Sequence, residues 1–166
     1  MDLFLDRYES PIGVILLVTD DAALRALDFL EYETRMQRLL KLQNGSITLL
    51  ERAAPLGIKE RLEAYFHGQI RGIEEIQVRT GGTLFQKQIW TELRKIPAAS
   101  TATYGELAKK IGRPKASRAV GLANGANPIA IVVPCHRVIA STGALTGYGG
   151  GLARKRWLLE HEAAHG

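Results

Sequence analysis

The stretch TYGELAKKIGRPKASRAVGLANGANP, residues 103–128, predicts two short helices joined by a tight turn. Thr103 and Glu106 have the spacing of a capping box, so the first helix should begin at the residue after Thr103. It should stop at Gly112, and an Arg-Pro pair would turn the chain into a second helix over about residues 115–124. Two helices joined in this way are typical of helix-turn-helix DNA-binding proteins, although such pairs also occur in ordinary cores.

The second helix combines small side chains with one long cation, Arg118, near its middle. An ordinary helix is about 10–12 Å across and the minor groove about 6 Å wide, so a slim helix suits a widened minor groove. Arg118 could then reach the base stack, although small residues also permit close helix packing inside a protein. The residues that we expect at a DNA surface are Thr103, Lys115, Ala116, Ser117, Arg118, Ala119 and Gly121.

The basic charge of the chain is concentrated in its second half. Residues 1–82 hold 10 Lys/Arg and 13 Asp/Glu, a net charge of −3, whereas residues 83–166 hold 12 and 4, a net charge of +8. Such an imbalance is expected of a surface that faces phosphates, but a solvated basic face would look the same. Charge and periodicity both change at Gly81–Gly82, which predicts domains over residues 1–80 and 83–166.

Composition excludes several classes of protein. No apolar run approaches the roughly 18 residues of a membrane helix, and the opening MDLFLDRYES lacks the basic start of a signal peptide, so we expect a cytoplasmic protein. One cysteine excludes an internal disulfide and a Cys-rich zinc site. Without a phosphate-binding glycine motif we expect no nucleotide cofactor. We also expect no metal, because four histidines appear scattered without ligand spacing: His67, His136, His161 and His165.

The first half of the chain reads as mixed α and β structure. Residues 3–8, 14–19 and 25–30 are predicted to form an antiparallel meander of strands. Helices should follow near residues 33–42 and 57–66. The alternation of apolar and polar residues over 73–79 predicts one more strand. After the boundary, the sequence FQKQIWTELRKIP from residue 85 predicts a core helix that ends at a proline.

The single cysteine has unusual neighbours. Residues 129–133 are rich in β-branched side chains and predict a buried strand that Pro134 ends, which places Cys135 at a strand exit. A lone cysteine beside apolar residues is usually inert packing. Here His136 could supply a base, through a bridging water if needed, and Arg137 adds positive charge, and both favour the thiolate.

A catalytic histidine needs a group that orients its ring. The last helix, from about residue 151, offers Glu160 or Glu162, and we expect one of them to turn inward beside His136. Between the cysteine and this helix lies the glycine-rich loop ASTGALTGYGGG, residues 140–151, in which Tyr148 could stack on a flat ligand.

Together these motifs resemble the O6-alkylguanine-DNA alkyltransferase family. They are PCHRV at residues 134–138, Asn-Pro seven residues before the cysteine, Tyr-x-x-Leu-Ala from residue 104, Ser-Arg-Ala-Val-Gly from residue 117, and GYGGGLxxKxxLLxxE from residue 147. The likeness is strong from residue 84 to 162 and looser before it.

The resemblance implies an α/β (α+β) fold: an N-terminal lobe resembling ribonuclease H and a mainly helical, winged helix-turn-helix-like lobe that binds DNA. It implies DNA repair, in which an alkyl group passes directly and irreversibly from O6 of a flipped guanine in duplex DNA to Cys135. The thioether product has no easy route back to the thiol. We therefore expect one turnover per chain, by a monomer with no cofactor and no obligatory protein partner.

The resemblance also implies individual roles. His136 would deprotonate Cys135 through a water, Glu162 would orient His136, Tyr104 would act as an acid near N3 of the base, and Arg118 would fill the gap in the duplex. Gly149 replaces a side chain that contacts the base in other members, which puts that contact in doubt. The residues expected to support or line the substrate pocket are Asn127, Val138, Tyr148, Gly149 and Gly150.

Two other functions are compatible with these residues. A cysteine hydrolase could use Cys135, His136 and Glu162 to turn over an ester or a peptide. A non-catalytic module could instead recognise alkylated DNA for other repair factors. The fate of the thiol distinguishes the three hypotheses.

Overall fold

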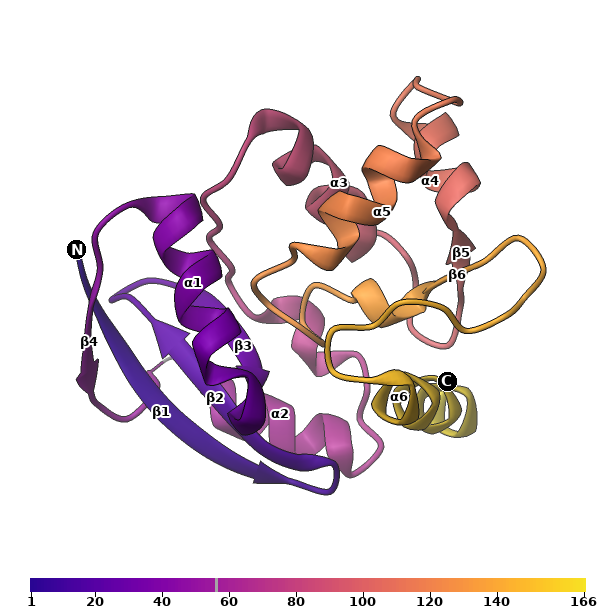
Figure 1. Ribbon diagram of the computed structural model, residues 1–166. Helices are drawn as coiled ribbons and strands as arrows, with labels where there is room; N and C mark the ends of the chain where they lie inside the picture. The colour runs from indigo at the N-terminus through magenta and orange to yellow at the C-terminus, as the bar shows by residue number, and fades with distance from the viewer. Residues whose placement is uncertain (56) are drawn as a thin grey trace. The chain divides into compact units, whose positions relative to one another are not determined.

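The computed structural model describes residues 1–55 and 57–166 (Figure 1). Contacts divide it into two compact units, one of residues 1–82 with 128–132, and one of residues 83–127 with 133–166. The chain therefore returns to the first unit for residues 128–132. From the sequence we expected residues 83–166 to form one continuous domain, without this return. No helix in these two described ranges is long and apolar enough to cross a membrane.

The first unit is built on a four-stranded sheet of order β3-β2-β1-β4. As predicted, β1 (Asp2–Ser10), β2 (Gly13–Thr19) and β3 (Leu24–Phe29) form an antiparallel meander. The sequence did not reveal β4 (Thr48–Glu51), which pairs in parallel with β1. Its four residues are mostly exposed, so it lacks the apolar alternation that marks a longer strand.

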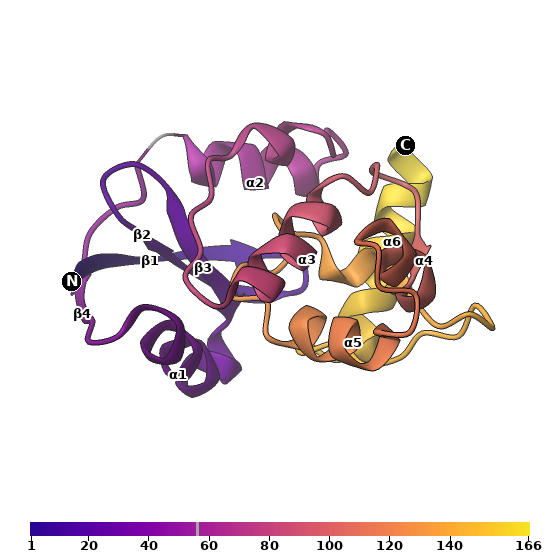
Figure 2. The same cartoon turned by 90° about the horizontal axis from the view of Figure 1, so that it is seen from above.

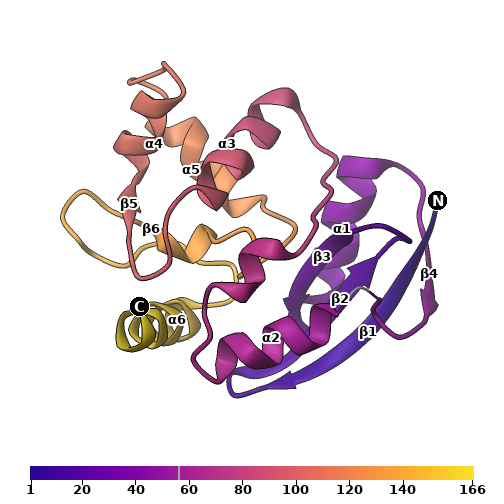
Figure 3. The ribbon, with the colours of Figure 1, turned by 180° about the vertical axis from the view of Figure 1, so that it is seen from behind.

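Two helices cover opposite faces of this sheet (Figures 2 and 3). A 3-10 turn, η1 (Leu30–Tyr32), leads from β3 into α1 (Glu33–Asn44), and α2 (Ile58–Phe66) lies on the other face. Both helices were predicted. The core beneath α1 is formed by apolar side chains of the sheet and the helix: Leu3, Leu5, Leu16, Val18, Ala26, Met36 and Leu40.

The strand expected over residues 73–79 is wrong. The chain forms a 3-10 helix, η2 (Gly72–Glu75), and only Val78 makes a β-bridge, to Leu24 at the outer edge of β3. The alternation in the sequence is real, but Ile73 and Ile76 are buried by a helical turn instead of by sheet pairing.

The strand expected over residues 129–133 is also wrong, although the segment is largely buried. Ile129 bridges to Leu27, farther along the same edge of β3, and the pairing then ends. Ile131 has a φ of +69°, and the Val132 amide donates to the Ala130 carbonyl at 2.8 Å, so the backbone turns back on itself. The β-branched residues of this segment are therefore explained by burial, and they do not form the hydrogen-bond ladder of a strand.

The second unit is mainly helical. It contains α3 (Leu84–Arg94), α4 (Tyr104–Lys110), α5 (Ser117–Gly125) and α6 (Leu152–His165), with a 3-10 turn, η3 (Cys135–Arg137). Two-residue strands β5 (Ala102–Thr103) and β6 (Val138–Ile139) pair in parallel. This pairing places the start of α4 beside the segment that follows the cysteine.

The predicted helix-turn-helix is confirmed in α4 and α5. The Glu106 amide donates to Thr103 Oγ1 at 3.1 Å and the Thr103 amide donates to Glu106 Oε1 at 3.2 Å, so the capping box is complete. Gly112 has a φ of +74°, which the turn after α4 requires and which favours glycine. The second helix begins at Ser117, two residues later than expected, because the Ala116 amide is engaged in a preceding turn.

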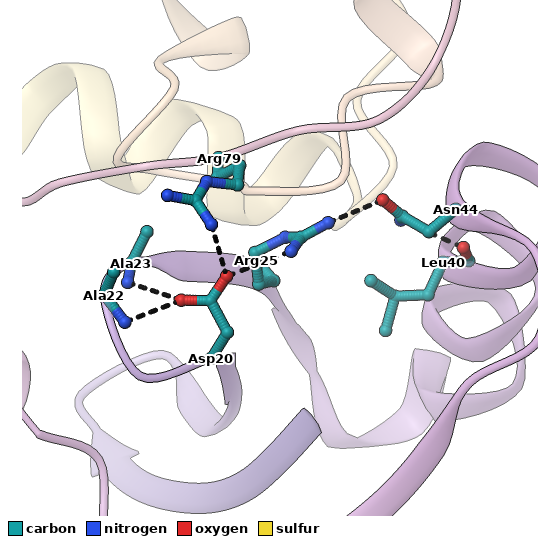
Figure 4. Close-up of polar contacts among 7 residues, drawn as sticks. All are labelled: Asp20, Ala22, Ala23, Arg25, Leu40, Asn44 and Arg79. Carbon is teal, nitrogen blue, oxygen red and sulfur yellow. Dashed lines mark hydrogen bonds and ion pairs between the residues drawn. The ribbon is translucent and has the colours of Figure 1, made fainter. Parts of the chain in front are cut away.

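A polar network holds the end of the first unit together (Figure 4). Arg25 on β3 is buried, and it donates to Asp20 Oδ2 at 3.0 Å and to Asn44 Oδ1 at 2.6 Å at the end of α1. Arg79, more exposed, also donates to Asp20, at 3.3 Å. Two residues after Arg79, an added Cβ at Gly81 would lie 2.0 Å from the Gln43 carbonyl oxygen, so only glycine fits there. The boundary segment is thus fixed to α1.

Arg25→Ala should lower the free energy of unfolding by about 2 kcal/mol, because it removes the central donor of the partly buried Asp20 carboxylate and Asn44 amide. Arg79→Ala is the matched control, since its guanidinium is 60% exposed on the same carboxylate, and it should cost less than about 1 kcal/mol. Urea denaturation of both variants measures the difference. Equal losses would show that Arg25 has no special role in the network.

Candidate active site

Helix α5 presents a slim, exposed face that carries one cation. Trp90 Nε1 on α3 donates to the Ala123 carbonyl at 2.8 Å and fixes the buried side of α5, which includes Val120. Arg118 and Ala119 are exposed. Two explanations of the small residues therefore apply to different faces: Ala123 permits internal packing, whereas Ala119 leaves space beside Arg118. One turn farther along the exposed side, Leu122 is 73% exposed.

Tyr104, at the start of α4, lies between α5 and the glycine-rich loop. Its ring is 3.8 Å from where a Cβ of Gly121 would be, and its hydroxyl donates to the Thr146 carbonyl at 3.5 Å. Gly147 is also close, since a Cβ there would lie 4.0 Å from the Tyr104 hydroxyl. The side chain thus connects the helix pair to the loop.

Cys135 is the first residue of η3, not the end of a strand, and only 7% of its surface is exposed. Its amide donates to the Val133 carbonyl at 2.8 Å, which closes the turn before it. Asn127 Nδ2 donates to the same Val133 carbonyl at 2.8 Å, so a residue at the end of α5 supports this turn. Asn124, which sequence reasoning passed over, donates to the Cys135 carbonyl at 3.5 Å.

The residue after the cysteine meets a carboxylate from α6. His136 Nε2 lies 2.8 Å from Glu162 Oε2, and both side chains are fully buried. Glu160, the other candidate, is exposed. The prediction that one of these glutamates turns inward is confirmed, and the residue is Glu162.

Arg137 has a different role from the one expected. Its Nε donates to Glu162 Oε1 at 2.8 Å, its Nη2 to Oε2 at 3.0 Å and its Nη1 to the Ile96 carbonyl at 2.8 Å. A bidentate guanidinium–carboxylate pair is strong and directional. The guanidinium of Arg137 therefore pairs with the Glu162 carboxylate. The sequence led us to expect that this charge would act directly on the Cys135 thiol, and the contacts do not favour that role.

These contacts set the protonation of the pair. Burial alone would raise the pKa of Glu162, but hydrogen bonds and charge from His136 and Arg137 outweigh it and hold that pKa well below its usual range. Burial lowers the pKa of His136, and the hydrogen bond and charge of Glu162 offset this only in part.

Glu162 is therefore ionised and His136 neutral near pH 7. An ionised carboxylate only accepts hydrogen bonds, so Nε2 of His136 carries the proton and Nδ1 carries a lone pair. Nδ1 is buried and has no hydrogen-bond partner within residues 1–55 and 57–166. This atom has the properties of a general base.

Comparison with known proteins identifies this arrangement. Residues 84–164 match the family model for the DNA binding domain of 6-O-methylguanine DNA methyltransferase, and residues 4–80 match the model for its ribonuclease-like domain. The chain belongs to the 6-O-methylguanine DNA methyltransferase family.

Relatives from distant organisms agree with this assignment. Methylated-DNA–protein-cysteine methyltransferases of Salmonella typhimurium and Methanosarcina acetivorans are both 45% identical to this chain, over 96% and 95% of it and 95% and 96% of their own lengths. The crystal structure of Mycobacterium tuberculosis O6-methylguanine methyltransferase is 42% identical, with a TM-score of 0.82, and covers 99% of this chain and 94% of its own. A structure of the same bacterium's protein in complex with DNA is 40% identical, with a TM-score of 0.80 over the same shares.

In this methyltransferase family member, one buried cation was not foreseen from the sequence. Lys155 on α6 is fully buried, and its Nζ donates to the Val138 carbonyl at 2.6 Å and to the Thr146 carbonyl at 2.7 Å. Burial lowers the pKa of Lys155, and attraction to Cys135 opposes that shift. The helical spacing could have indicated this burial. Lys155 precedes Leu158 by three residues and Glu162 by seven, so all three lie on the same, buried face of α6.

The glycine-rich loop is therefore tied down at Thr146, whose carbonyl accepts from both Lys155 and Tyr104. Farther along, the Gly151 amide donates to the Tyr148 carbonyl at 2.9 Å, and a turn leads into α6. The remaining residues expected in the pocket differ in exposure: Val138 and Gly150 are buried, Tyr148 is half-buried and Gly149 is exposed.

Glu162→Gln should lower the free energy of unfolding by about 3 kcal/mol, because Arg137 would remain buried without a counter-charge. Glu160→Gln, on the exposed side of the same helix, should change it by less than about 0.5 kcal/mol. Chemical denaturation of the two variants tests this. A Glu162→Gln protein as stable as the control would contradict the importance of the buried pair.

Proposed function

We propose that this chain repairs duplex DNA by transferring an alkyl group from O6 of guanine to the sulfur of Cys135. The observation that carries the proposal is the buried His136–Glu162 pair, in which the unprotonated Nδ1 belongs to the residue that follows the cysteine in the chain. The same unit contains the helix pair α4–α5, so thiol chemistry and a DNA-binding motif share one compact body. Membership of the methyltransferase family adds the nature of the substrate.

The transfer requires only groups of the chain and one water. Nδ1 of His136 takes the thiol proton through that water, and ionised Glu162 stabilises the imidazolium that results. The thiolate attacks the alkyl carbon, an S–C bond forms, and the C–O6 bond breaks with its electrons moving into the purine. Tyr104 is the proposed acid that returns a proton near N3. The products are guanine and a thioether, so each chain reacts once.

The DNA is proposed to meet the exposed face of α5. Arg118 would occupy the space that the extruded guanine leaves, while the outer face of the helix approaches the minor groove. Base extrusion costs a few kcal/mol, and least for a poorly paired lesion. The expected contacts of this surface, besides Arg118, are Thr103, Lys115, Ala116, Ser117, Ala119 and Gly121.

The extruded base would enter beside the cysteine. Val138, half-buried Tyr148 and the backbone of Gly149 and Gly150 are proposed to line its pocket, and Asn127 to support it through its bond to the Val133 carbonyl. In this proposal, residues 83–166 form the alkyltransferase domain and residues 1–80 form a separate α/β domain. Because the acceptor is a side chain, no cofactor or protein partner is required, and the chain would act as a monomer.

The need for a reduced thiol and for access to chromosomal DNA favours the cytoplasm as the location. Binding to duplex DNA should weaken steeply with salt, because phosphate contacts dominate such interfaces.

Incubation with an oligonucleotide containing O6-methylguanine should add one methyl group to each chain, on Cys135, as intact and peptide mass spectrometry would show. The reaction should stop at one lesion per protein. Cys135→Ser should remain unmodified and leave the lesion in place. Many turnovers would support the cysteine hydrolase, and unchanged lesion removal by Cys135→Ser would overturn the role of the thiol.

Arg118→Ala should slow the reaction with duplex substrate by about tenfold or more, a loss of about 1.4 kcal/mol of transition-state stabilisation. Its reaction with free O6-alkylguanine should change far less, because no gap in a duplex has to be filled. Lys95→Ala, which removes another exposed cation from the same unit, is the matched control. If Arg118→Ala slows both substrates equally, Arg118 does not act on the duplex.

A further inference from the structure

The C-terminal part of α6 carries two histidines, in the sequence HEAAH at residues 161–165, that the active site does not use. The expectation of no metal was drawn from all four histidines together, but His161 and His165 taken as a pair are four residues apart. Residues four apart lie on one face of a helix, one turn above the other. Both belong to the described part of α6, and neither is buried.

The two rings are close and ordered. Their centroids are 4.6 Å apart, and the ring of His161 also stacks on Trp157, with centroids 4.7 Å apart and planes inclined by 19°. Two imidazole nitrogens bound to one tetrahedral ion at about 2.0–2.1 Å would lie roughly 3.4 Å apart.

A hydrogen bond selects the ligating nitrogen of His165. Its Nδ1 lies 2.8 Å from the His161 carbonyl oxygen. A carbonyl only accepts, so Nδ1 carries the proton, and in the neutral ring Nε2 carries the lone pair. Metal-binding histidines are commonly held in this way, with the second ring nitrogen donating to a backbone carbonyl.

The second residue of this sequence, Glu162, excludes a zinc-protease site. Glu162 faces His136 and Arg137 on the buried side of α6, so it cannot serve as a base at an ion held on the outer side. Across residues 1–55 and 57–166 no group of three or more His, Cys, Asp or Glu side chains could hold a metal. Water would therefore complete the coordination of an ion held by two imidazoles.

We infer that His161 and His165 bind one divalent transition-metal ion at the C-terminal end of α6. Imidazole ligands suit Cu²⁺, Ni²⁺ and Zn²⁺. The partial negative charge at the C-terminal end of a helix adds a favourable term for a cation. Because the ligands flank Glu162 in the chain, a bound ion would also stabilise the helical turn that holds this carboxylate. The inference is independent of the proposed function.

The test is a titration of the full-length Cys135→Ser protein with NiCl₂ by isothermal calorimetry, since removing the thiol removes a competing ligand. One ion should bind per chain. His161→Ala and His165→Ala should each weaken binding by about tenfold or more, because a single imidazole remains. His67→Ala should leave it unchanged. His67 is exposed and its Nδ1 also bonds a carbonyl four residues back, that of Glu63 at 2.8 Å, but the residues four before and four after it, Glu63 and Arg71, are not histidines.

A second measurement keeps the inference testable if a variant is less stable. Ni²⁺ should raise the Tm of the Cys135→Ser protein, and this rise should disappear in the variant that also lacks both His161 and His165. Unaltered helical circular dichroism of that variant in the absence of metal would show that it is folded. No saturable binding, or binding that persists without both histidines, would overturn the inference.

Discussion

The second unit depends on one buried carboxylate. Glu162 accepts hydrogen bonds from both His136 and Arg137, and these contacts fix the end of η3 against α6. An isolated carboxylate in such a place would be expelled or protonated, because burial of an unpaired charge is costly. With Arg137 bidentate on it, the carboxylate stays ionised, and an ionised carboxylate forces the neighbouring imidazole into one tautomer. The ionised Glu162 carboxylate therefore both holds η3 against α6 and sets the tautomer of His136.

A second buried charge completes this arrangement. Lys155 donates to the carbonyls of Val138 and Thr146, and thereby joins the segment after the cysteine to the glycine-rich loop. Its residual positive charge acts on Cys135. Hydrogen bonds from Asn127, Asn124 and Lys155 thus hold the backbone before, at and after Cys135.

Local signals in the sequence were the reliable ones. The capping box at Thr103 and Glu106 predicted the start of α4 because both hydrogen bonds lie within one turn. The sequence could not say whether Glu160 or Glu162 faces His136. The answer depends on which side of α6 is buried, and tertiary packing determines that side. The same is true of Lys155, whose residue type indicates a surface position. Where sequence reasoning failed, it took apolar residues for a strand. Residues 73–79 bury Ile73 and Ile76 on a helical turn, whereas residues 129–133 are largely buried, as predicted, but turn back on themselves.

The two segments that were wrongly predicted as strands, residues 73–79 and 129–133, protect one edge of the sheet. Backbone from residues 77–79 and 128–130 bonds to Leu24 and Leu27, so the outer edge of β3 is occupied without any added full-length strand. The opposite edge is the short β4. Unpaired edges are where sheets of separate chains join and aggregate. The bonds at Leu24 and Leu27 therefore leave less of the β3 edge open to a strand from another copy of the chain.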